Sequence, residues 1–143
     1  MSLIRVLVVE DFAPFRELIG SIIAQKTNLR VVCEVCDGVE AIQKAEELKP
    51  DLILLDIGLP RLSGIEAARQ IRGLSASSKI IFVSQESDPE VVEEVLCLGA
   101  QGYVGKTRAG NDLLPAIAEV LDGRQFVSAG LISNNPTLPA RRA

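Results

Sequence analysis

Hydrophobic and polar positions divide the chain into five short apolar runs that alternate with longer segments of helical periodicity. The apolar runs have the length and the continuous hydrophobicity of strands that are buried on both faces. We predict strands over Leu3–Val9, Leu29–Cys36, Asp51–Leu55, Lys79–Val83 and Gly102–Gly105. Such runs favour a parallel sheet, because a half-exposed strand would alternate apolar and polar residues.

Between these runs, apolar residues recur at spacings of three and four, the period of an amphipathic helix. Ser63, with Glu66 three residues later, forms a capping box that predicts the start of the third helix. Asp88 followed by Pro89 predicts the start of the fourth. The residues that define the five apolar helix faces are Phe15, Leu18, Ile19, Ile22 and Ile23; Ile42, Ala45 and Leu48; Ile65, Ala68 and Ile71; Val92, Val95 and Leu96; and Leu113, Leu114, Ile117 and Leu121.

This alternation predicts an α/β fold, namely a (βα)5 doubly wound five-stranded parallel sheet with helices on both faces. By analogy with flavodoxin-like proteins we expect the strand order 2-1-3-4-5, which opens a crevice at the carboxyl ends of strands 1 and 3. We expect one domain over residues 3–127. In residues 128–143 the periodicity fades and Gly, Asn and Pro recur, so this segment is predicted to be a linker or tail.

Polar side chains follow four of the five predicted strands at their carboxyl ends. Glu10 and Asp11 follow the first strand, Asp56 the third, Ser84 the fourth and Lys106 the fifth. Because parallel strands end at the same edge of a sheet, we expect these side chains to lie close together. A carboxylate that ends an uninterrupted apolar strand is costly to bury unless it is paired. Asp56 is therefore the most informative of these residues.

The chemistry of this set points to a cation and to phosphoryl transfer. Three carboxylates without a neighbouring His or Cys favour a hard ion such as Mg²⁺. Lys106 adds a positive charge and Ser84 a hydroxyl group, so Asp56 is a candidate nucleophile for a phosphoryl group. A carboxylate needs no general base, which agrees with a sequence that contains no histidine.

Four sequence elements occur in an order that one known family shares. They are Val8-Val9-Glu10-Asp11, Leu54-Leu55-Asp56-Ile57-Gly58-Leu59-Pro60, the strand-ending Ser84, and Gly102-Tyr103-Val104-Gly105-Lys106. On these elements the chain resembles the CheY-like receiver domains of two-component response regulators. The segments 111–117 and 123–128 are similar to the LuxR/NarL branch, in which a helix-turn-helix DNA-binding domain follows the receiver.

The resemblance implies a role for each matching residue. Asp56 would accept a phosphoryl group from a sensor histidine kinase. Mg²⁺ would be held by Glu10, Asp11 and Asp56, with the backbone carbonyl of Gly58 as a further ligand. Lys106 would pair with the phosphate. The domain would then catalyse only its own phosphorylation and dephosphorylation, and would not act as an enzyme on other substrates.

The resemblance also implies a switch and an output. Ser84 would hydrogen-bond to the phosphate and, by moving inward, let Tyr103 swing between exposed and buried positions. Phosphorylation would alter the face around the fourth helix, the fifth strand and the fifth helix, and could promote a homodimer. Gln85 departs from the family, which usually has a small residue there, and we expect its side chain to narrow access to Asp56.

Composition and charge limit the other classes of function. A net charge of −4 argues against nucleic-acid binding by this segment alone, so DNA would be bound through a further C-terminal domain. No apolar run approaches the roughly 20 residues of a membrane span and no signal-peptide pattern precedes the first strand, so we expect a cytoplasmic protein. Cys33, Cys36 and Cys97 are too few for a zinc site without histidine, and we expect reduced core thiols.

Several alternatives remain open at the level of sequence. Glu10 and Asp11 could be ordinary turn residues, Ser84 a cap, Lys106 a solvated side chain and Tyr103 a residue that fills an edge strand. A flavodoxin-like or Rossmann cofactor-binding protein would need a glycine-rich turn after the first strand, which this chain lacks. An aspartyl-phosphate hydrolase would need a second acid or base. For the output, the alternative to transcription control is a stand-alone receiver that acts through protein–protein contacts.

Overall fold

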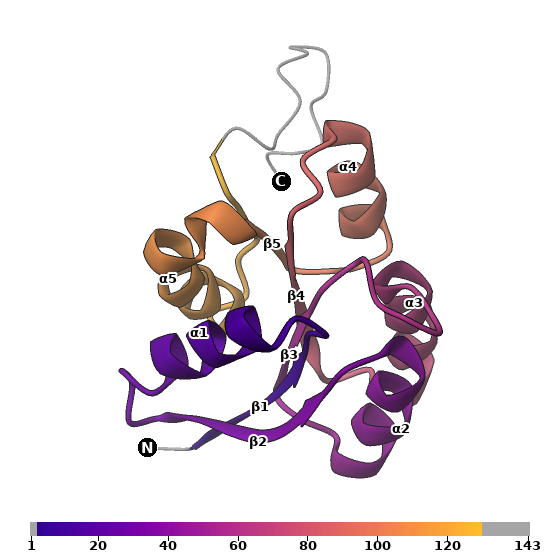
Figure 1. The fold of residues 1–143 in the computed structure, drawn as a ribbon, viewed down its shortest axis with the longest axis horizontal. Coiled ribbons are helices and arrows are strands. Elements are labelled where there is room, and N and C mark those ends of the chain that lie inside the picture. Colours follow the sequence, from indigo (N-terminus) through magenta and orange to yellow (C-terminus); the bar gives the residue numbers. More distant parts are fainter. Residues whose placement is uncertain (1–2, 130–143) are drawn as a thin grey trace.

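A parallel β-sheet forms the middle layer of the protein, and α-helices cover both of its faces (Figure 1). The computed structural model describes residues 3–129. The strands are β1 (Ile4–Val9), β2 (Leu29–Val35), β3 (Leu52–Leu55), β4 (Lys79–Ser84), β5 (Gly102–Gly105) and β6 (Phe126–Val127). The helices are α1 (Ala13–Ile23), α2 (Gly38–Leu48), α3 (Gly64–Leu74), α4 (Pro89–Cys97) and α5 (Ala109–Leu121), with a 3-10 turn, η1 (Lys106–Arg108), before α5.

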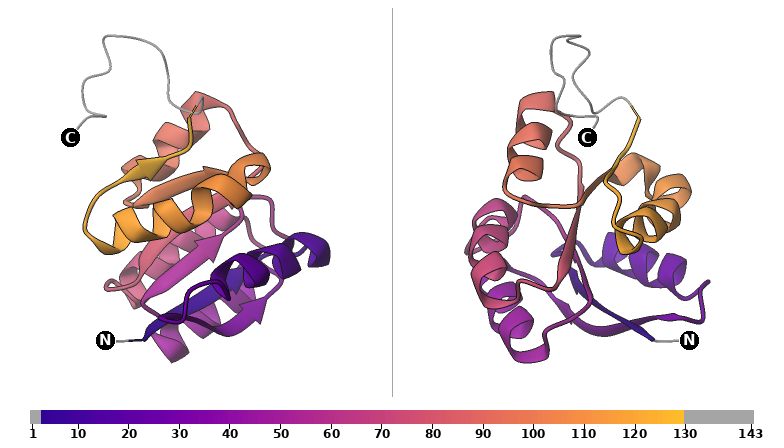
Figure 2. Two further views of the ribbon diagram at one scale, coloured as in Figure 1. Left: turned by 90° about the vertical axis from the view of Figure 1, so that its left-hand side faces the viewer. Right: turned by 180° about the vertical axis from the view of Figure 1, so that it is seen from behind.

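The two faces of the sheet carry two separate hydrophobic cores, because successive side chains of a strand point to opposite faces. In β1, Val6 and Val8 face α1 and α5, whereas Leu7 and Val9 face α2, α3 and α4. Figure 2 shows these two helical layers on either side of the sheet. The strands are therefore apolar throughout, which leaves their carboxyl ends as the place for polar chemistry.

Side-chain caps fix where α2, α3 and α4 begin. The Ser63 side chain accepts a hydrogen bond from the Glu66 N–H, and the Asp88 side chain accepts one from the Glu90 N–H, so both predicted helix starts are confirmed. Asp37 caps α2 in the same way. Each cap places the first turn of its helix beside the carboxyl edge of the sheet, directly after a strand and its loop.

The strand order is β2-β1-β3-β4-β5-β6, so the predicted order of the first five strands is confirmed and a sixth strand is added. All neighbouring strands pair in parallel, and Phe126 and Val127 of β6 pair with Gly102 and Tyr103 of β5. Two residues are too few to show periodicity, which is why the sequence did not reveal β6. With β6 in place, β5 is an interior strand, so the interpretation of Tyr103 as an edge-strand residue is wrong.

The expectation of core thiols holds in part for Cys33, which packs against the core, and is wrong for Cys36. All three cysteines are free, but Cys36 and Cys97 are exposed and Cys33 is only partly buried. Cys36 lies just beyond the end of β2, and Cys97 is the last residue of α4. The chain leaves the core at both positions. Among the described residues, no helix is long and apolar enough to cross a bilayer.

Candidate phosphoacceptor and cation site

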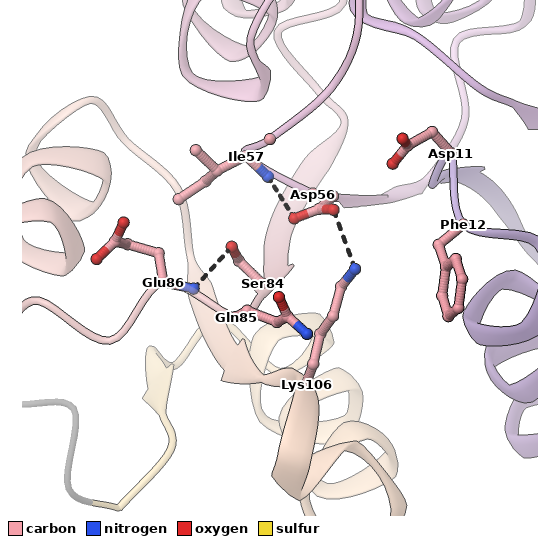
Figure 3. Close-up of a pocket in the computed structure, with 9 residues that line it drawn as sticks. Asp11, Phe12, Asp56, Ile57, Ser84, Gln85, Glu86 and Lys106 are labelled. Carbon is pink, nitrogen blue, oxygen red and sulfur yellow. Dashed lines mark hydrogen bonds and ion pairs between the residues drawn. The ribbon is translucent and has the colours of Figure 1, made fainter.

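The carboxyl ends of β1, β3, β4 and β5 bring the five predicted polar residues to one edge of the sheet. Glu10 directly follows β1, and its N–H donates to the Val35 carbonyl of β2. Asp56 directly follows β3, and its N–H donates to the Val9 carbonyl of β1. The strand ladder thus continues for one residue beyond each strand and fixes the backbone of both carboxylates. Figure 3 shows the direct contact between Asp56 and Lys106 in the wall of the cavity at this edge.

Three carboxylates meet at this edge. Glu10, Asp11 and Asp56 each offer an oxygen atom, and these atoms lie within 4.8 Å of one another. Glu10 is 1% exposed and Asp56 is 7% exposed, whereas Asp11 is open to solvent. Two buried carboxylates beside a third one require a positive partner, since an isolated buried charge is strongly disfavoured.

Lys106 provides part of that positive charge. Its ammonium nitrogen lies 3.0 Å from Glu10 Oε2 and 3.1 Å from Asp56 Oδ2. It also lies 4.8 Å from the centre of the Phe15 ring, in cation–π geometry. Burial alone would lower the pKa of Lys106, but the hydrogen bonds to Glu10 and Asp56 outweigh it, and the pKa is above its usual value. The lysine is therefore held in its charged form.

One positive charge does not balance the site. Burial raises the pKa of Glu10 above its usual value, against the lowering effect of hydrogen bonds from Lys106 and the Phe12 N–H. Glu10 Oε1 faces the ammonium group at 3.0 Å but accepts no hydrogen bond from the described residues. An all-oxygen set with a buried, unsatisfied carboxylate atom and an excess of negative charge fits a hard divalent cation.

The loop after β3 is packed directly against α3. The carboxylate of Asp56 accepts a hydrogen bond of 2.7 Å from the Ile57 N–H through Oδ1, and Oδ2 pairs with Lys106. A Cβ atom added at Gly64 would lie 1.9 Å from the Asp56 carbonyl oxygen, so only glycine permits this approach. The backbone of Asp56 is thereby held from both sides, by β1 and by the start of α3.

A cavity of about 470 Å³ opens over the carboxylates. Its walls are formed by the residues that end the strands and by those that follow them, namely Asp11, Phe12, Asp56, Ile57, Gly58, Ser84, Gln85, Glu86 and Lys106. The predicted residues Gly58 and Gln85 thus line the same cavity as Asp56. A smaller cavity of about 260 Å³ continues between Gln85 and Thr107. The space above Asp56 is large enough for a phosphoryl group.

Ser84 and Tyr103 both contact the loop after β4. The hydroxyl oxygen of Ser84 accepts a hydrogen bond of 3.2 Å from the Glu86 N–H, and the Tyr103 hydroxyl donates to the Glu86 carbonyl at 2.8 Å. Tyr103 is fully buried and stacks on Phe82 at 6.2 Å between ring centres. Tyr103 does not line the main cavity, and the structure shows its inward position.

Because Tyr103 is buried, the pH at which its hydroxyl ionises tests whether the side chain points inward in solution. Burial raises the pKa of Tyr103 from 10.0 to about 12, although a hydrogen bond with Ser84 lowers it in part. The folded state therefore binds the phenolic proton more tightly than the unfolded chain does, and stability falls as pH rises from about 10 towards 12, by up to roughly 2–3 kcal/mol. Because Tyr103 is the sole tyrosine and tryptophan is absent, tyrosinate absorbance reports it directly.

The measurement is an absorbance titration of the folded protein, with circular dichroism to confirm folding at each pH. We expect little tyrosinate at pH 11, where the same chain in urea is already mostly ionised. Ionisation of the folded protein near pH 10 would show that Tyr103 is exposed in solution.

Two neighbours of the site were not predicted. Phe15 contacts Lys106, and Phe12 lines the cavity although it is 60% exposed. The helical period of α1 accounts for Phe15 as an ordinary core residue, so its sequence position carries no separate signal. Phe12 lies directly after two acidic residues, a position that the expected strand-end site could have identified.

Together, the fold and the site define a parallel α/β protein with a carboxylate and lysine cluster at the carboxyl edge of its sheet. Residues 6–118 match the family model described as the response regulator receiver domain. The chain belongs to this family. The interpretation of Lys106 as a solvated side chain does not agree with its burial and its ion pairs to Glu10 and Asp56.

Individual relatives support the same assignment. The nitrate/nitrite response regulator protein NarL of Escherichia coli K12 is 33% identical over 126 residues, which cover 88% of this chain and 58% of NarL. A protein-glutamate methylesterase/protein-glutamine glutaminase of Methanosarcina acetivorans is 32% identical over 94% of this chain and 38% of its own length. A crystal structure of a LuxR-family two-component response regulator from Aurantimonas sp. SI85-9A1 is 31% identical, with a TM-score of 0.86, over 91% of this chain and 93% of that one. The chain spans little more than half the length of NarL.

Proposed function

We propose that Asp56 is the phosphoacceptor of this receiver domain and takes its phosphoryl group from a sensor histidine kinase. The single observation that carries the proposal is the environment of Asp56. Its carboxylate is 7% exposed, pairs with Lys106 at 3.1 Å and opens into a cavity beside two further carboxylates. A carboxylate that pairs with a lysine and lines a cavity is a candidate nucleophile that needs no general base.

The cation would be Mg²⁺. Glu10, Asp11 and Asp56 supply carboxylate oxygens, and the carbonyl of Gly58, which lines the same cavity, is the further ligand that we propose. When bound, Mg²⁺ neutralises negative charge on the phosphoryl oxygens and on the carboxylates that surround them. Such an ion also explains why two carboxylates can remain buried beside a single ammonium group.

The remaining residues would position the phosphoryl group. An oxygen atom of Asp56 attacks phosphorus and forms the acyl phosphate bond, while the bond from phosphorus to the donor histidine breaks and the imidazole leaves. Lys106 faces Asp56 and would pair with the phosphoryl oxygens. Ser84 would hydrogen-bond to them, and this movement would release its present contacts with the loop after β4 and with Tyr103.

The output would be the surface around α4, β5 and α5. Ser84 accepts a hydrogen bond from the Glu86 N–H, and Tyr103 donates one to the Glu86 carbonyl, in the loop before α4. A change at either residue would therefore alter the position of α4. We propose that phosphorylation promotes a homodimer through this surface and controls transcription through a C-terminal DNA-binding domain. This rests on the similarity to NarL and to the LuxR-family structure.

The alternative is a stand-alone receiver that acts through protein–protein contacts, without enzymatic activity of its own. The methylesterase relative shows that receiver-like sequences also occur in enzymes, so the output is decided by what accompanies the domain. We propose 3–127 as the receiver and 128–143 as the linker or tail, of which 130–143 lie outside the described residues. A helix-turn-helix sequence after Ala143 would favour a transcription regulator over a stand-alone receiver.

Intact-mass measurement tests the phosphoacceptor. After incubation with acetyl phosphate and Mg²⁺, we expect the protein to gain one phosphoryl group, and to gain none when a chelator removes the cation. A wild-type protein that gains no phosphoryl group under either condition, and none from any sensor histidine kinase, would overturn the proposal.

Access to Asp56 is expected to depend on Gln85. Its exposed side chain lines both cavities beside Ser84 and Lys106, so shortening it opens the route for a small phosphodonor. We expect Gln85→Ala to be labelled several-fold faster by acetyl phosphate than the wild type. Gln70→Ala, on the surface of α3, is the matched control and should label at the wild-type rate. An unchanged rate in Gln85→Ala would remove this role.

A further inference from the structure

A buried serine at the end of β6 connects the C-terminal segment to the loop that carries Lys106. Ser128 is completely buried, and its N–H donates to the Tyr103 carbonyl at 2.9 Å. Its hydroxyl donates to Asp112 Oδ2 at 2.7 Å and accepts a hydrogen bond of 3.2 Å from the Gly105 N–H. A single hydroxyl group therefore joins β5, β6 and α5 immediately beside Lys106.

Asp112, which accepts the hydrogen bond from Ser128, is held in place by Arg108. Asp112 is 8% exposed, and Arg108 donates to both of its carboxylate oxygens, at 2.8 and 3.3 Å. The hydrogen bond from Arg108, together with that from Ser128, holds the pKa of Asp112 below its usual value, so the carboxylate is ionised at neutral pH. The bonds run from Gly105 through Ser128 and Asp112 to Arg108.

Gly105 and Arg108, the two ends of this series of hydrogen bonds, lie on either side of Lys106 in the sequence. Gly105 precedes Lys106, and Arg108 is the last residue of the 3-10 turn that Lys106 begins. Glycine loses more conformational freedom on folding than any other residue, so a glycine before a functional lysine leaves its backbone poorly restrained unless another contact fixes it. The hydrogen bond from the Gly105 N–H to Ser128, the residue directly after β6, is such a contact.

We propose that Ser128, with Asp112, is a positioning residue that holds Lys106 against Asp56. This inference rests on the proposed role of Lys106 at the phosphorylation site. It also implies that displacement of β6 loosens Lys106, so that the position of β6 and the rate of phosphoryl transfer are coupled. Neither residue touches the cavity over Asp56, so both would act through the backbone of the Lys106 loop.

The test compares two buried serines at opposite edges of the sheet. Ser128→Ala removes both hydroxyl contacts beside Lys106. Ser78→Ala is the matched control, because Ser78 is 6% exposed and bonds to Ser75 and the Pro50 carbonyl at the amino end of β4. Both variants should lose stability. Only Ser128→Ala should be phosphorylated more slowly by acetyl phosphate at saturating Mg²⁺, by about three- to tenfold, the effect of one or two hydrogen bonds.

Two further readouts separate positioning from a general loss of structure. Mg²⁺ affinity, measured by calorimetry, should match the wild type in Ser128→Ala, because none of the cation ligands is changed. The amide hydrogen of Gly105 should exchange faster in Ser128→Ala but not in Ser78→Ala. If Ser128→Ala does not fold, Asp112→Asn is used, since it keeps an acceptor for Ser128 but loses the charge that holds Arg108, and we expect it to be slowed as well.

The outcomes distinguish this inference from the proposed function. A wild type that is phosphorylated normally and a Ser128→Ala variant with the same rate would overturn the positioning role alone. Equal slowing of Ser128→Ala and Ser78→Ala would also overturn it, since the effect would then be a general consequence of lost stability. A wild type that takes up no phosphoryl group would overturn both, because Lys106 would have no phosphoryl group to meet.

Discussion

Asp56→Asn is expected to abolish phosphoryl uptake completely while leaving the fold intact. The asparagine oxygen can still accept the hydrogen bond from the Ile57 N–H, and Lys106 keeps its contact with Glu10. The amide group, however, lacks the negative charge that makes the carboxylate a nucleophile. The measurement is intact mass after incubation with acetyl phosphate and Mg²⁺, with the unfolding midpoint in urea recorded for the same samples.

The effect of Asp56→Asn on stability should be small, because two contributions oppose each other. The substitution removes the ion pair between Asp56 and Lys106, but it also removes the repulsion that contributes to the raised pKa of Glu10. We expect a change of about 1 kcal/mol or less in the free energy of unfolding. Asp122→Asn, at an exposed aspartate after α5, is the control and should be phosphorylated like the wild type. Equal phosphorylation of Asp56→Asn would place the acceptor at another residue.

The positions of the chemically active groups could be predicted from the sequence because one physical rule fixes them. Parallel strands end at one edge of a sheet, so Glu10, Asp56, Ser84 and Lys106 had to meet once the five strands were identified. The order of those strands needed an analogy, since periodicity alone does not say which strands are neighbours. Both steps are confirmed by the sheet of the structure.

Contacts between distant segments could not be predicted in the same way. Phe15 and Lys106 come from opposite ends of the domain, and the aromatic ring is already explained by the apolar face of α1. The bonds of Ser128 depend on β6, whose two residues give no periodic signal. The inward position of Tyr103 depends on burial and on its hydrogen bond to the Glu86 carbonyl, neither of which the sequence pattern shows.

Lys106→Met is expected to lower the free energy of unfolding by about 2–4 kcal/mol at neutral pH, even without a phosphodonor. Methionine keeps the apolar stem of the side chain, so the principal change is the lost charge. Glu10 and Asp56, 1% and 7% exposed, would then face each other without an ammonium group between them. The urea midpoint should fall while the slope of the transition remains the same.

The dependence on pH identifies the cause of this loss. Burial already raises the pKa of Glu10, and its hydrogen bond with Lys106 opposes that effect, so Lys106→Met should raise the pKa further. The folded variant would then bind a proton more tightly than its unfolded chain, and its deficit should be largest above the raised pKa and shrink as pH falls towards 4.5, the ordinary value for Glu. The double variant Glu10→Gln/Lys106→Met should recover part of the stability at neutral pH.

Magnesium should compensate for the missing lysine. A cation that binds the folded state alone stabilises it by mass action, and in Lys106→Met no ammonium group competes with the cation for Glu10 and Asp56. We therefore expect Mg²⁺ to raise the urea midpoint of Lys106→Met more than that of the wild type. Lys44→Met, which breaks an exposed ion pair with Glu47, should leave stability nearly unchanged and show no added response to Mg²⁺. An equal Mg²⁺ response in Lys106→Met and the wild type would mean that the ammonium group and the cation do not share these carboxylates.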